Sequence, residues 1–487
     1  MTKNQSLHSW LPKLNNVTVV CIGDVMLDQY VYGDVDRVSP EAPIPVLNVS
    51  RRAHAIGGAG NVVCNIAALG GGAHLVAVIG DDPAGRQVRD LLAGVGGTVH
   101  RLLVASDRPT TVKTRFIAGS QQLLRVDDET VGNLAKELLE TVVEGATSVL
   151  AAPGPGAVIL SDYGKGVLPD GVIQRLIAAS QAAGVPVIVD PKGADYAKYS
   201  GADVLTPNRK ELSEATRLPT HSSDEIVAAA ERLIEICGVR HVLVTRGAEG
   251  MSLVSADGAP LHLPALAREI FDVSGAGDTV VAVLATGLAA GMTIAEAAQL
   301  ANVAAGLVVA KVGTAVVRNA ELADAVDVAA TISKSIVDEK QLAEQVAQWR
   351  SRGLSIGFTN GCFDLVHPGH ISLLEQADAQ CDRLIIGLNS DASVARLKGA
   401  GRPVQNAAAR GRVLASVAAV DAVVVFEDDT PVELIRKIRP DVLVKGADYT
   451  LDEVVGGEFV RSYGGRVVLA DLVDGFSTTE TIARLSR

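Results

Sequence analysis

The chain lacks the features that define several large protein classes. Aromatic residues make up only 3% of its 487 residues, and the formal charge of −12 argues against a general affinity for nucleic acid or anionic membranes. The five cysteines include no C-x-x-C pair, so we expect reduced thiols. The opening residues, MTKNQSLHSWLPKL, contain no apolar stretch of the kind found in signal peptides. These absences predict a cytoplasmic protein that binds neither nucleic acid nor membrane.

Long apolar runs and internal repeats are also missing. The longest apolar run, from Val280 to Met292, is interrupted by Thr286, Gly287 and Gly291. It is too short to span a bilayer and predicts a buried helix instead.

Short β-branched runs, each followed by a turn signal and a helix-like segment, recur along the chain. In the first part these runs are Val17–Ile22, Leu75–Ile79, Ala157–Leu160, Val185–Val189 and Val242–Thr245. The pattern predicts a doubly wound, mainly parallel α/β sheet with ligands at the carboxyl ends of its strands.

A second, smaller α/β unit is predicted near the C-terminus. Its strand candidates are Ser355–Thr359, Leu384–Leu388, Ala422–Phe426, Val442–Val444 and Val467–Leu469. The residues before them are rich in Ala, Glu, Gln and Lys, with helical periodicity and no strand signal. We therefore expect a first domain over 1–331, a helical linker over 332–357 and a second domain over 358–487.

One segment of the first domain alternates like a β-hairpin. The sequences TTVKTRF and QLLRVDD flank a turn at Ala118, Gly119 and Ser120. Lys113 and Arg115 lie two residues apart and so share one face of the hairpin. An inserted hairpin of this kind suits a lid over a substrate.

The run Gly275-Ala276-Gly277-Asp278 precedes the apolar helix. Its backbone N–H groups and the helix start suit the charge on a transferring phosphate, and Asp278 is placed to accept a hydroxyl proton. Taken alone, the run is more simply explained as a helix N-cap with a tight turn.

Three further motifs accompany it. They are Gly57-Gly-Ala-Gly-Asn-Val62, Asn208-Arg-Lys-Glu211 and Thr245-Arg-Gly-Ala-Glu-Gly250. In order and spacing, residues 15–320 resemble the ribokinase-like (PfkB-type) carbohydrate kinases. The resemblance implies a ribokinase-like fold with a small β lid, and a kinase that transfers the γ-phosphate of ATP to a sugar hydroxyl.

The resemblance also implies roles for single residues. Asp278 would be the catalytic base, and Gly275, Ala276 and Gly277 the anion hole. ATP, with Mg²⁺ at Asn208 and Glu211, would contact Asn208, Arg209, Lys210, Glu211, Thr245, Gly247 and Gly250. The sugar would contact Asp24, Gly57, Gly58 and Asn61, and Lys113 and Arg115 of the lid. Val273 stands where many relatives carry Thr, a difference that bears on a candidate monovalent-cation site.

Basic residues suggest that the sugar already carries a phosphate. The candidates are Lys113, Arg115, Arg125, Lys165 and Lys192. Each alone is more simply a solvated surface cation, but together they favour a phosphorylated sugar.

A different phosphate motif, FTNGCFDLVHPGH, spans Phe358 to His370. His367 and His370 project from one face of a helix start, where two imidazoles can hydrogen-bond an α-phosphate under attack. A metal site or a purely structural pair are the alternatives, but no Cys/His cluster completes a metal site.

Residues 354–487 resemble the cytidylyltransferase-like nucleotidyltransferases, which have a Rossmann-like fold. Class I aminoacyl-tRNA synthetases share a related HxGH element, but their KMSKS motif is missing here. The resemblance implies catalysis by His367 and His370. It implies nucleotide contacts by Gly361, Phe363, Asp364, Lys398, Arg402, Lys445, Ser477, Thr478 and Thr479.

The combined chain resembles the bifunctional enzymes of ADP-heptose synthesis. This implies a heptose 7-phosphate 1-kinase and a heptose 1-phosphate adenylyltransferase acting for the lipopolysaccharide core, with Mg²⁺, no permanent protein metal site, and a homodimer. A fused enzyme with another product, such as a CDP-linked one, is the nearest alternative. A nucleotide-sensing protein with degenerate sites is another, although intact Asp278, His367 and His370 argue against it.

The implied pathway needs a phosphatase between its two steps. Asp34-Val-Asp-Arg-Val38 matches a phosphatase pattern by letter, but no hydrophobic strand directly precedes its first Asp. We therefore expect a separate phosphatase as a partner.

Overall fold

The computed structural model describes residues 7–119, 121–152, 154–265, 275–311, 313, 315–326, 336–351, 353–399, 401–447 and 449–471. The chain divides into two compact units, Met1–Val326 and Asp327–Arg487. None of the helices within the described ranges has the length and apolarity needed to cross a lipid bilayer.

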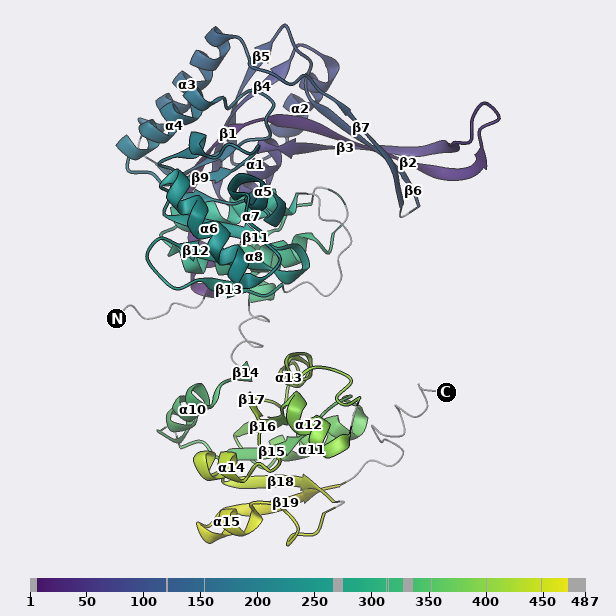
Figure 1. Ribbon diagram of the computed structural model, residues 1–487, viewed down its shortest axis with the longest axis vertical. Helices are drawn as coiled ribbons and strands as arrows, with labels where there is room; N and C mark the ends of the chain where they lie inside the picture. Colours follow the sequence, from purple (N-terminus) through teal and green to yellow (C-terminus); the bar gives the residue numbers. More distant parts are fainter. Residues whose placement is uncertain are drawn as a thin grey trace. The chain divides into compact units, whose positions relative to one another are not determined.

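A nine-stranded sheet forms the centre of the first unit (Figure 1), in the order β13-β12-β11-β10-β9-β8-β1-β4-β5. Its strands are β1 (Thr18–Gly23), β4 (Gly72–Gly80), β5 (Thr98–Ala105), β8 (Pro155–Ser161), β9 (Val187–Asp190), β10 (Val204–Leu205), β11 (His241–Thr245), β12 (Met251–Ser255) and β13 (Leu261–Leu263). Neighbouring strands pair in parallel except for β11–β12 and β12–β13. Each of the five predicted runs coincides with one of these strands, and the expected doubly wound sheet is confirmed.

Helices cover both faces of this sheet. One face packs against α3 (Lys136–Leu150), α4 (Asp170–Ala182) and α6 (Ser223–Cys237), and the other against α1 (Ala59–Ala68), α7 (Ala276–Ala289) and α8 (Ile294–Val308). Successive side chains of β1 point to opposite faces of the sheet. Val20 and Ile22 pack in the core on the side of α3, α4 and α6, whereas the Cys21 thiol contacts the Ala59 carbonyl of α1 at 3.6 Å. The helix predicted from Val280 onward is α7, which is buried over most of its length. Further helical segments are η1 (Leu7–Asn16), α2 (Pro83–Ala93), η2 (Ala197–Tyr199), α5 (Arg209–Thr216) and η3 (Gly247–Glu249), and residues 319–326 are helical as well.

The lid is larger than the predicted hairpin. The expected strands are β6 (Val112–Ala118) and β7 (Gln121–Asp128), and they pair in antiparallel fashion. They join β2 (Val25–Val38) and β3 (Pro45–Gly58) in a four-stranded sheet of order β3-β2-β6-β7. Figure 1 shows β2 and β3 extending away from the body of this unit. The sequence did not reveal β2 because the first half of this strand is buried on both faces and shows no alternation.

The second unit contains a six-stranded parallel sheet of order β14-β17-β16-β15-β18-β19. Its strands are β14 (Ile336–Val337), β15 (Ile356–Gly361), β16 (Arg383–Asn389), β17 (Ala422–Phe426), β18 (Val442–Gly446) and β19 (Arg466–Ala470). Its helices are α10 (Glu339–Ser351), α11 (Pro368–Asp378), α12 (Asp391–Lys398), α13 (Ala407–Ala415), α14 (Val432–Ile438) and α15 (Gly457–Ser462). Two apolar cores, one on each face, give the expected Rossmann-like layers.

The prediction that residues 332–357 form a linker is wrong. Within it, β14 pairs with β17, and Leu342 and Val346 of α10 are buried in the core of the second unit. The segment is polar overall, so its one apolar helix face was overlooked, and this face packs against the sheet of the second unit.

Replacing a core side chain of α10 tests this correction. Leu342→Ala should lower the free energy of unfolding of the second unit by about 2–5 kcal/mol, because the buried leucine leaves a cavity. Thermal unfolding should show a lower midpoint, whereas Glu344→Ala on the exposed face should not. Equal midpoints for the two variants would mean that α10 is a linker after all.

Candidate active sites

The strand order places the first candidate site at the carboxyl ends of β1 and β8. From β1 the chain proceeds to β4 and β5 on one side and later to β8 and β9 on the other. Ligands of open α/β sheets bind in the crevice beside such a reversal of strand order. Asp24 follows β1 there, and Asp162 and Tyr163 follow β8.

The predicted base, Asp278, lies buried in the first turn of α7. Its carboxylate accepts hydrogen bonds from Asn61 Nδ2 at 2.7 Å and from the Tyr163 hydroxyl at 2.8 Å. Burial raises the pKa of Asp278 to about 6, although the hydrogen bonds from Asn61 and Tyr163 lower it. A carboxyl with this pKa is deprotonated at neutral pH and sits near the ideal range for a general base.

The start of α7 has the form of an anion hole. Gly275 is the N-cap with a φ of +78°, a conformation that glycine adopts without strain, and Ala276 and Gly277 follow. N–H groups at a helix start have no carbonyl partner within the helix, so they can bind negative charge. A Cβ at Gly277 would meet no atom within 4 Å, which leaves space for a ligand.

Glycine is required where β3 meets α1. A side chain at Gly57 would collide with the Asp28 carboxylate, and one at Gly58, whose φ is +60°, with the Asp24 carbonyl. Asn61 then lies in α1, where Asn65 donates to its carbonyl at 3.0 Å. These contacts hold the Asn61 amide against Asp278.

Asp24 holds a loop in this structure. Its carboxylate accepts from the backbone N–H groups of Tyr163 at 2.9 Å, Lys165 at 3.0 Å and Val167 at 3.2 Å. Burial raises its pKa, and these hydrogen bonds oppose that rise. The predicted contact of Asp24 with sugar hydroxyls stays a prediction.

Several residues predicted to bind ATP line one cavity of about 160 Å³. Asn208, Glu211, Thr245 and Gly277 share it with Asp190. Asn208 caps α5, with its Oδ1 accepting from the Glu211 N–H at 2.9 Å. Burial and the charges of Asp278 and Glu211 hold the pKa of Asp190 well above its usual range. A cation beside these carboxylates would relieve their repulsion.

Other predicted ATP contacts lie elsewhere. Arg209 is ion-paired with Glu249, and Lys210 lies 3.7 Å from Glu214 on the surface. Gly247 and Gly250 form the turn around η3, where a side chain at Gly250 would collide with Leu263. None of these four residues lines the cavity described above.

The cations predicted to bind a substrate phosphate are ion-paired within the chain. The pairs are Lys113 with Asp127 at 3.2 Å, Arg115 with Asp28 at 2.5 Å, Arg125 with Asp127 at 2.9 Å, Lys165 with Glu129 at 2.6 Å and Lys192 with Glu211 at 3.0 Å. Glu129 also lies 3.6 Å from Lys113, so its carboxylate bridges the lid and the loop that carries Tyr163. Arg115 thus approaches the base indirectly, through Asp28.

The second candidate site lies at the carboxyl ends of β15 and β18, where strand order reverses again. Gly361 ends β15, and the Lys445 ammonium, from β18, donates to the Asn360 carbonyl at 2.9 Å. His367 is the N-cap of α11, and the rings of His367 and His370 stack with centroids 3.8 Å apart. The predicted pair therefore stands together at a helix start.

Burial favours the uncharged form of both histidines. It lowers the pKa of His367, and burial, together with repulsion from a protonated His367, lowers the pKa of His370 to about 4. Phe363 lies beside His370, with ring centroids 5.2 Å apart. Neutral imidazoles each carry one N–H that can donate to a phosphate oxygen.

The loops around this pair are held by buried charges. Asp364 accepts from Arg402 Nε at 2.5 Å and from the Val404 N–H at 2.7 Å. Lys398 is exposed at the end of α12. Val273, Ser477, Thr478 and Thr479 lie outside the described residues.

Arg410 is the largest buried polar residue near this site. Its guanidinium donates to the carbonyls of Cys362 at 2.5 Å, Asn389 at 2.9 Å and Gln405 at 3.0 Å, and it also pairs with Asp391. It thereby ties together the ends of β15 and β16, although the sequence showed only a basic residue.

Four residues of the first site were missed by sequence reasoning as site residues. They are Asp28, Asp162, Tyr163 and Asp190. Asp162 directly follows β8, and Asp190 is the last residue of β9. The carboxyl ends of parallel strands are where ligands bind, so both positions could have been predicted. The proximity of Asp28 and Tyr163 to Asp278 had no sequence signal.

Comparison with known proteins supports both halves. The model for the pfkB family of carbohydrate kinases matches residues 17–331, and the cytidylyltransferase-like model matches residues 358–480. The Bifunctional protein HldE of Rhodospirillum rubrum is 57% identical, over 100% of this chain and 98% of that protein. The protein of the same name from Paramagnetospirillum magneticum is 54% identical over the full length of both.

Solved structures resemble the first unit. A ribokinase from Arabidopsis thaliana, complexed with ribose and ATP, has a TM-score of 0.52 at 23% identity over 64% of this chain and 98% of its own. The tetrameric inhibited form of phosphofructokinase-2 from Escherichia coli has a TM-score of 0.55 at 19% identity, with the same coverage. These identities establish the ribokinase-like fold alone.

The geometry predicts how kinase turnover depends on pH. The kcat should rise as pH increases through about 6, because Asp278 must lose its proton before it can accept one. Tyr163→Phe removes a hydrogen bond that lowers this pKa, so the acid limb should move up by roughly one pH unit. Tyr196→Phe is the matched control, since the buried Tyr196 hydroxyl has no hydrogen-bond partner among the described residues. An acid limb that stays in place in Tyr163→Phe would contradict this role.

Proposed function

This chain belongs to the bifunctional HldE family and combines a carbohydrate kinase with a nucleotidyltransferase, and we propose that its two domains carry out two steps of ADP-heptose synthesis. The kinase phosphorylates carbon 1 of D-glycero-β-D-manno-heptose 7-phosphate. The transferase joins the adenylyl group of ATP to D-glycero-β-D-manno-heptose 1-phosphate, which releases pyrophosphate. The product serves the lipopolysaccharide core. The observation that carries this proposal is the full-length identity to HldE proteins, together with an intact base and an intact histidine pair at strand-end crevices.

In the kinase step, Asp278 accepts the proton of the carbon 1 hydroxyl as its oxygen attacks the γ-phosphate. Asn61 and Tyr163 orient the carboxylate through hydrogen bonds of 2.7 and 2.8 Å. The N–H groups at Gly275, Ala276 and Gly277 stabilise the charge on the transferring phosphate. ADP leaves, and the sugar becomes a 1,7-bisphosphate.

Mg²⁺ fits the donor set beside the nucleotide cavity. Asp190 and Glu211 would supply carboxylate oxygens, which Mg²⁺ prefers. The pKa of Asp190 is raised by burial and by the charges of Asp278 and Glu211, and a cation would oppose the part of the rise that these charges cause. When bound with ATP, the ion neutralises phosphate charge. A monovalent cation is a further proposal for the kinase half, and one solved structure of phosphofructokinase-2 contains potassium.

In the transferase step, the sugar phosphate attacks the α-phosphate of ATP and pyrophosphate leaves. His367 and His370 donate N–H groups to the α-phosphate oxygens while charge builds there. Lys398, Arg402 and Lys445 supply positive charge nearby, and Ser477, Thr478 and Thr479 hold the outer phosphates.

Partner chemistry follows from the two products. The kinase product carries a phosphate on carbon 7 that ADP-heptose lacks, so a separate phosphatase acts between the steps. The use of ATP supports a cytoplasmic location.

A homodimer formed through the lid is the proposed assembly. Several exposed apolar side chains lie on the lid, including Val38 at the end of β2, Ile44 in the turn before β3 and Leu124 of β7. A second copy would cover them, which fits the tendency of large exposed apolar patches to mark interfaces.

A fused kinase–transferase that makes a CDP-linked product is the alternative function.

The two sites should fail independently. Asp278→Asn keeps the shape but removes the base, so kinase kcat should fall by roughly 10²- to 10⁴-fold while adenylyl transfer continues. His370→Ala should have the opposite pattern, with a loss of about 10²-fold or more in transfer. Assays of each half-reaction on the same folded protein check this. Loss of both activities from either substitution would rule out independent sites.

The purified chain should stop midway along the route. With heptose 7-phosphate and ATP, it should release ADP and form the bisphosphate, but almost no pyrophosphate should appear. Addition of a separate sugar phosphatase should start the second step, and CTP in place of ATP should not support it. Mass spectrometry of the products decides. ADP-heptose made by the chain alone would show a third activity or a different substrate.

A further inference from the structure

Asn65 is a buried amide in α1, one helical turn beyond Asn61. Its Nδ2 donates to the Asn61 carbonyl at 3.0 Å and, over a longer distance of 3.4 Å, to Asn61 Oδ1. Its Oδ1 accepts from the Thr279 hydroxyl of α7 at 3.0 Å. The two polar ends of this side chain therefore contact both helices that form the base: α7, which carries Asp278, and α1, which carries the amide bound to it.

Four buried side chains form one chain of hydrogen bonds with a single direction. Thr279 donates to Asn65, Asn65 donates to Asn61, and Asn61 Nδ2 donates to the Asp278 carboxylate at 2.7 Å. Because Thr279 directly follows Asp278 in the sequence, the chain starts in α7, passes through α1 and returns to α7. The Thr279 hydroxyl also donates to the Gly275 carbonyl at 3.1 Å, so the start of α7 belongs to the same network.

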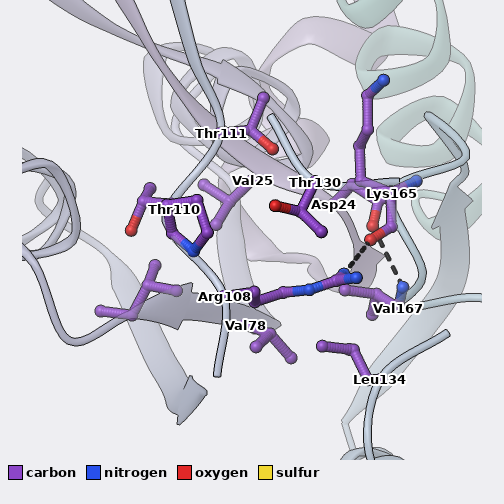
Figure 2. A pocket seen from close by; sticks show the side chains of 12 residues that line it. Asp24, Val25, Val78, Arg108, Thr110, Thr111, Thr130, Leu134, Lys165 and Val167 are labelled. Atoms are coloured by element: carbon purple, nitrogen blue, oxygen red, sulfur yellow. Dashed lines mark hydrogen bonds between the residues drawn. The ribbon is translucent and has the colours of Figure 1, made fainter. Parts of the chain in front are cut away.

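The two donors to the base are anchored in different ways. Tyr163 lies in the loop whose N–H groups bind Asp24, and Figure 2 shows Asp24 beside Val167 of this loop. The backbone of α1 is tied to Asp24 as well, because the Ala59 N–H donates to the Asp24 carbonyl at 2.9 Å. Neither contact determines which end of the Asn61 amide faces the base. Within the described part of the chain, Asn65 is the only donor to Asn61 Oδ1.

The orientation of this amide matters because either of its ends can form a hydrogen bond. A flipped Asn61 would present its oxygen to Asp278 and could accept from the protonated carboxyl, which favours the form that cannot act as a base. The same flip would place the N–H groups of Asn61 against those of Asn65, with no acceptor between them. Asn65 therefore opposes the flip, and Thr279 fixes Asn65 in the same manner.

We propose that Asn65 is a positioning residue of the kinase site, which holds the Asn61 amide with its N–H groups toward Asp278. The inference rests on the proposed kinase function, in which Asp278 is the base. Asn65 is buried and does not line the nucleotide cavity, so it acts through Asn61.

The competing explanation is that Asn65 only satisfies buried polar groups between α1 and α7. A residue with that role would affect the stability of the fold but not the protonation of the base. The acid limb of kinase kcat therefore separates the two explanations. Substitution of Asn65 leaves in place the titratable groups that interact with Asp278, which are Cys21, Asp28, Cys64, Tyr163 and Asp190.

Asn65→Leu keeps the approximate size of the side chain but removes both of its hydrogen-bonding ends. Because the hydrogen bond from Asn61 lowers the pKa of Asp278, the acid limb should move up from about 6 by roughly one pH unit. The kcat should then be about fivefold lower than that of the wild type near pH 6, and the two values should converge near pH 8. NMR titration of the Asp278 carboxyl in the protein without substrate should show the same shift.

Thr279→Val is the second variant, and it decides the question if Asn65→Leu does not fold. It removes the hydroxyl that fixes Asn65 and should move the acid limb in the same direction, whereas Thr279→Ser keeps a hydroxyl and should restore the wild-type position. Thr286→Val is the matched control, because Thr286 is an equally buried threonine of α7 that donates to the Ala282 carbonyl at 2.6 Å, away from the base. It should leave the acid limb in place.

An acid limb and an NMR titration that stay in place in folded Asn65→Leu or Thr279→Val would overturn the proposal, as would an equal shift in Thr286→Val. A wild-type chain that does not phosphorylate heptose 7-phosphate would instead contradict the proposed function. The two failures are distinguishable, because the NMR titration needs no substrate.

Discussion

The hydrogen bonds to the buried Asp24 carboxylate position the kinase site. A carboxylate away from water is costly unless it is satisfied, and here three backbone N–H groups of one loop satisfy it. Asp162 secures the same loop from the end of β8, where it accepts from the Gly164 N–H at 2.8 Å and from Lys198 and Tyr199. With both anchors in place, Tyr163 is held against Asp278. The position of the base thus depends on two acidic residues at neighbouring strand ends.

The second site uses the opposite chemistry for the same purpose. Arg410, fully buried, donates to three backbone carbonyls and pairs with Asp391. Because a buried guanidinium without partners would be strongly destabilising, these loops are fixed as a set. In one domain a carboxylate accepts hydrogen bonds from several backbone N–H groups, and in the other a guanidinium donates to several backbone carbonyls. Each arrangement fixes loop backbone that has no hydrogen bond to a neighbouring strand.

Local sequence features predicted much of this architecture. Every proposed strand of the two central sheets was found, since buried parallel strands show as β-branched runs. Asp278 at a helix start and the stacked His367 and His370 also followed from local spacing. Features that depend on distant partners did not follow. The linker prediction failed because only the second sheet gives α10 a buried face.

The same limit applies to the basic residues of the first domain. A lysine in a sequence shows its charge but not the carboxylate that neutralises it, and Lys113 and Lys165 were paired by residues brought close only by folding. Tyr163 carried no signal at all, because its partner Asp278 is more than a hundred residues away. The sequence therefore revealed which chemistry is present, and the fold determined which groups are left to perform it.

Glu129 joins the lid to the catalytic machinery mechanically. Its carboxylate lies 2.6 Å from Lys165 in the loop and 3.6 Å from Lys113 in the lid. A movement of the lid strands would therefore act on Lys165, which is two residues from Tyr163 in the same loop. The strength of this connection should depend on ionic strength, because it consists of partly exposed ion pairs that salt screens. Dissolved salt would then loosen the coupling between lid motion and the base without touching any group that handles the phosphate.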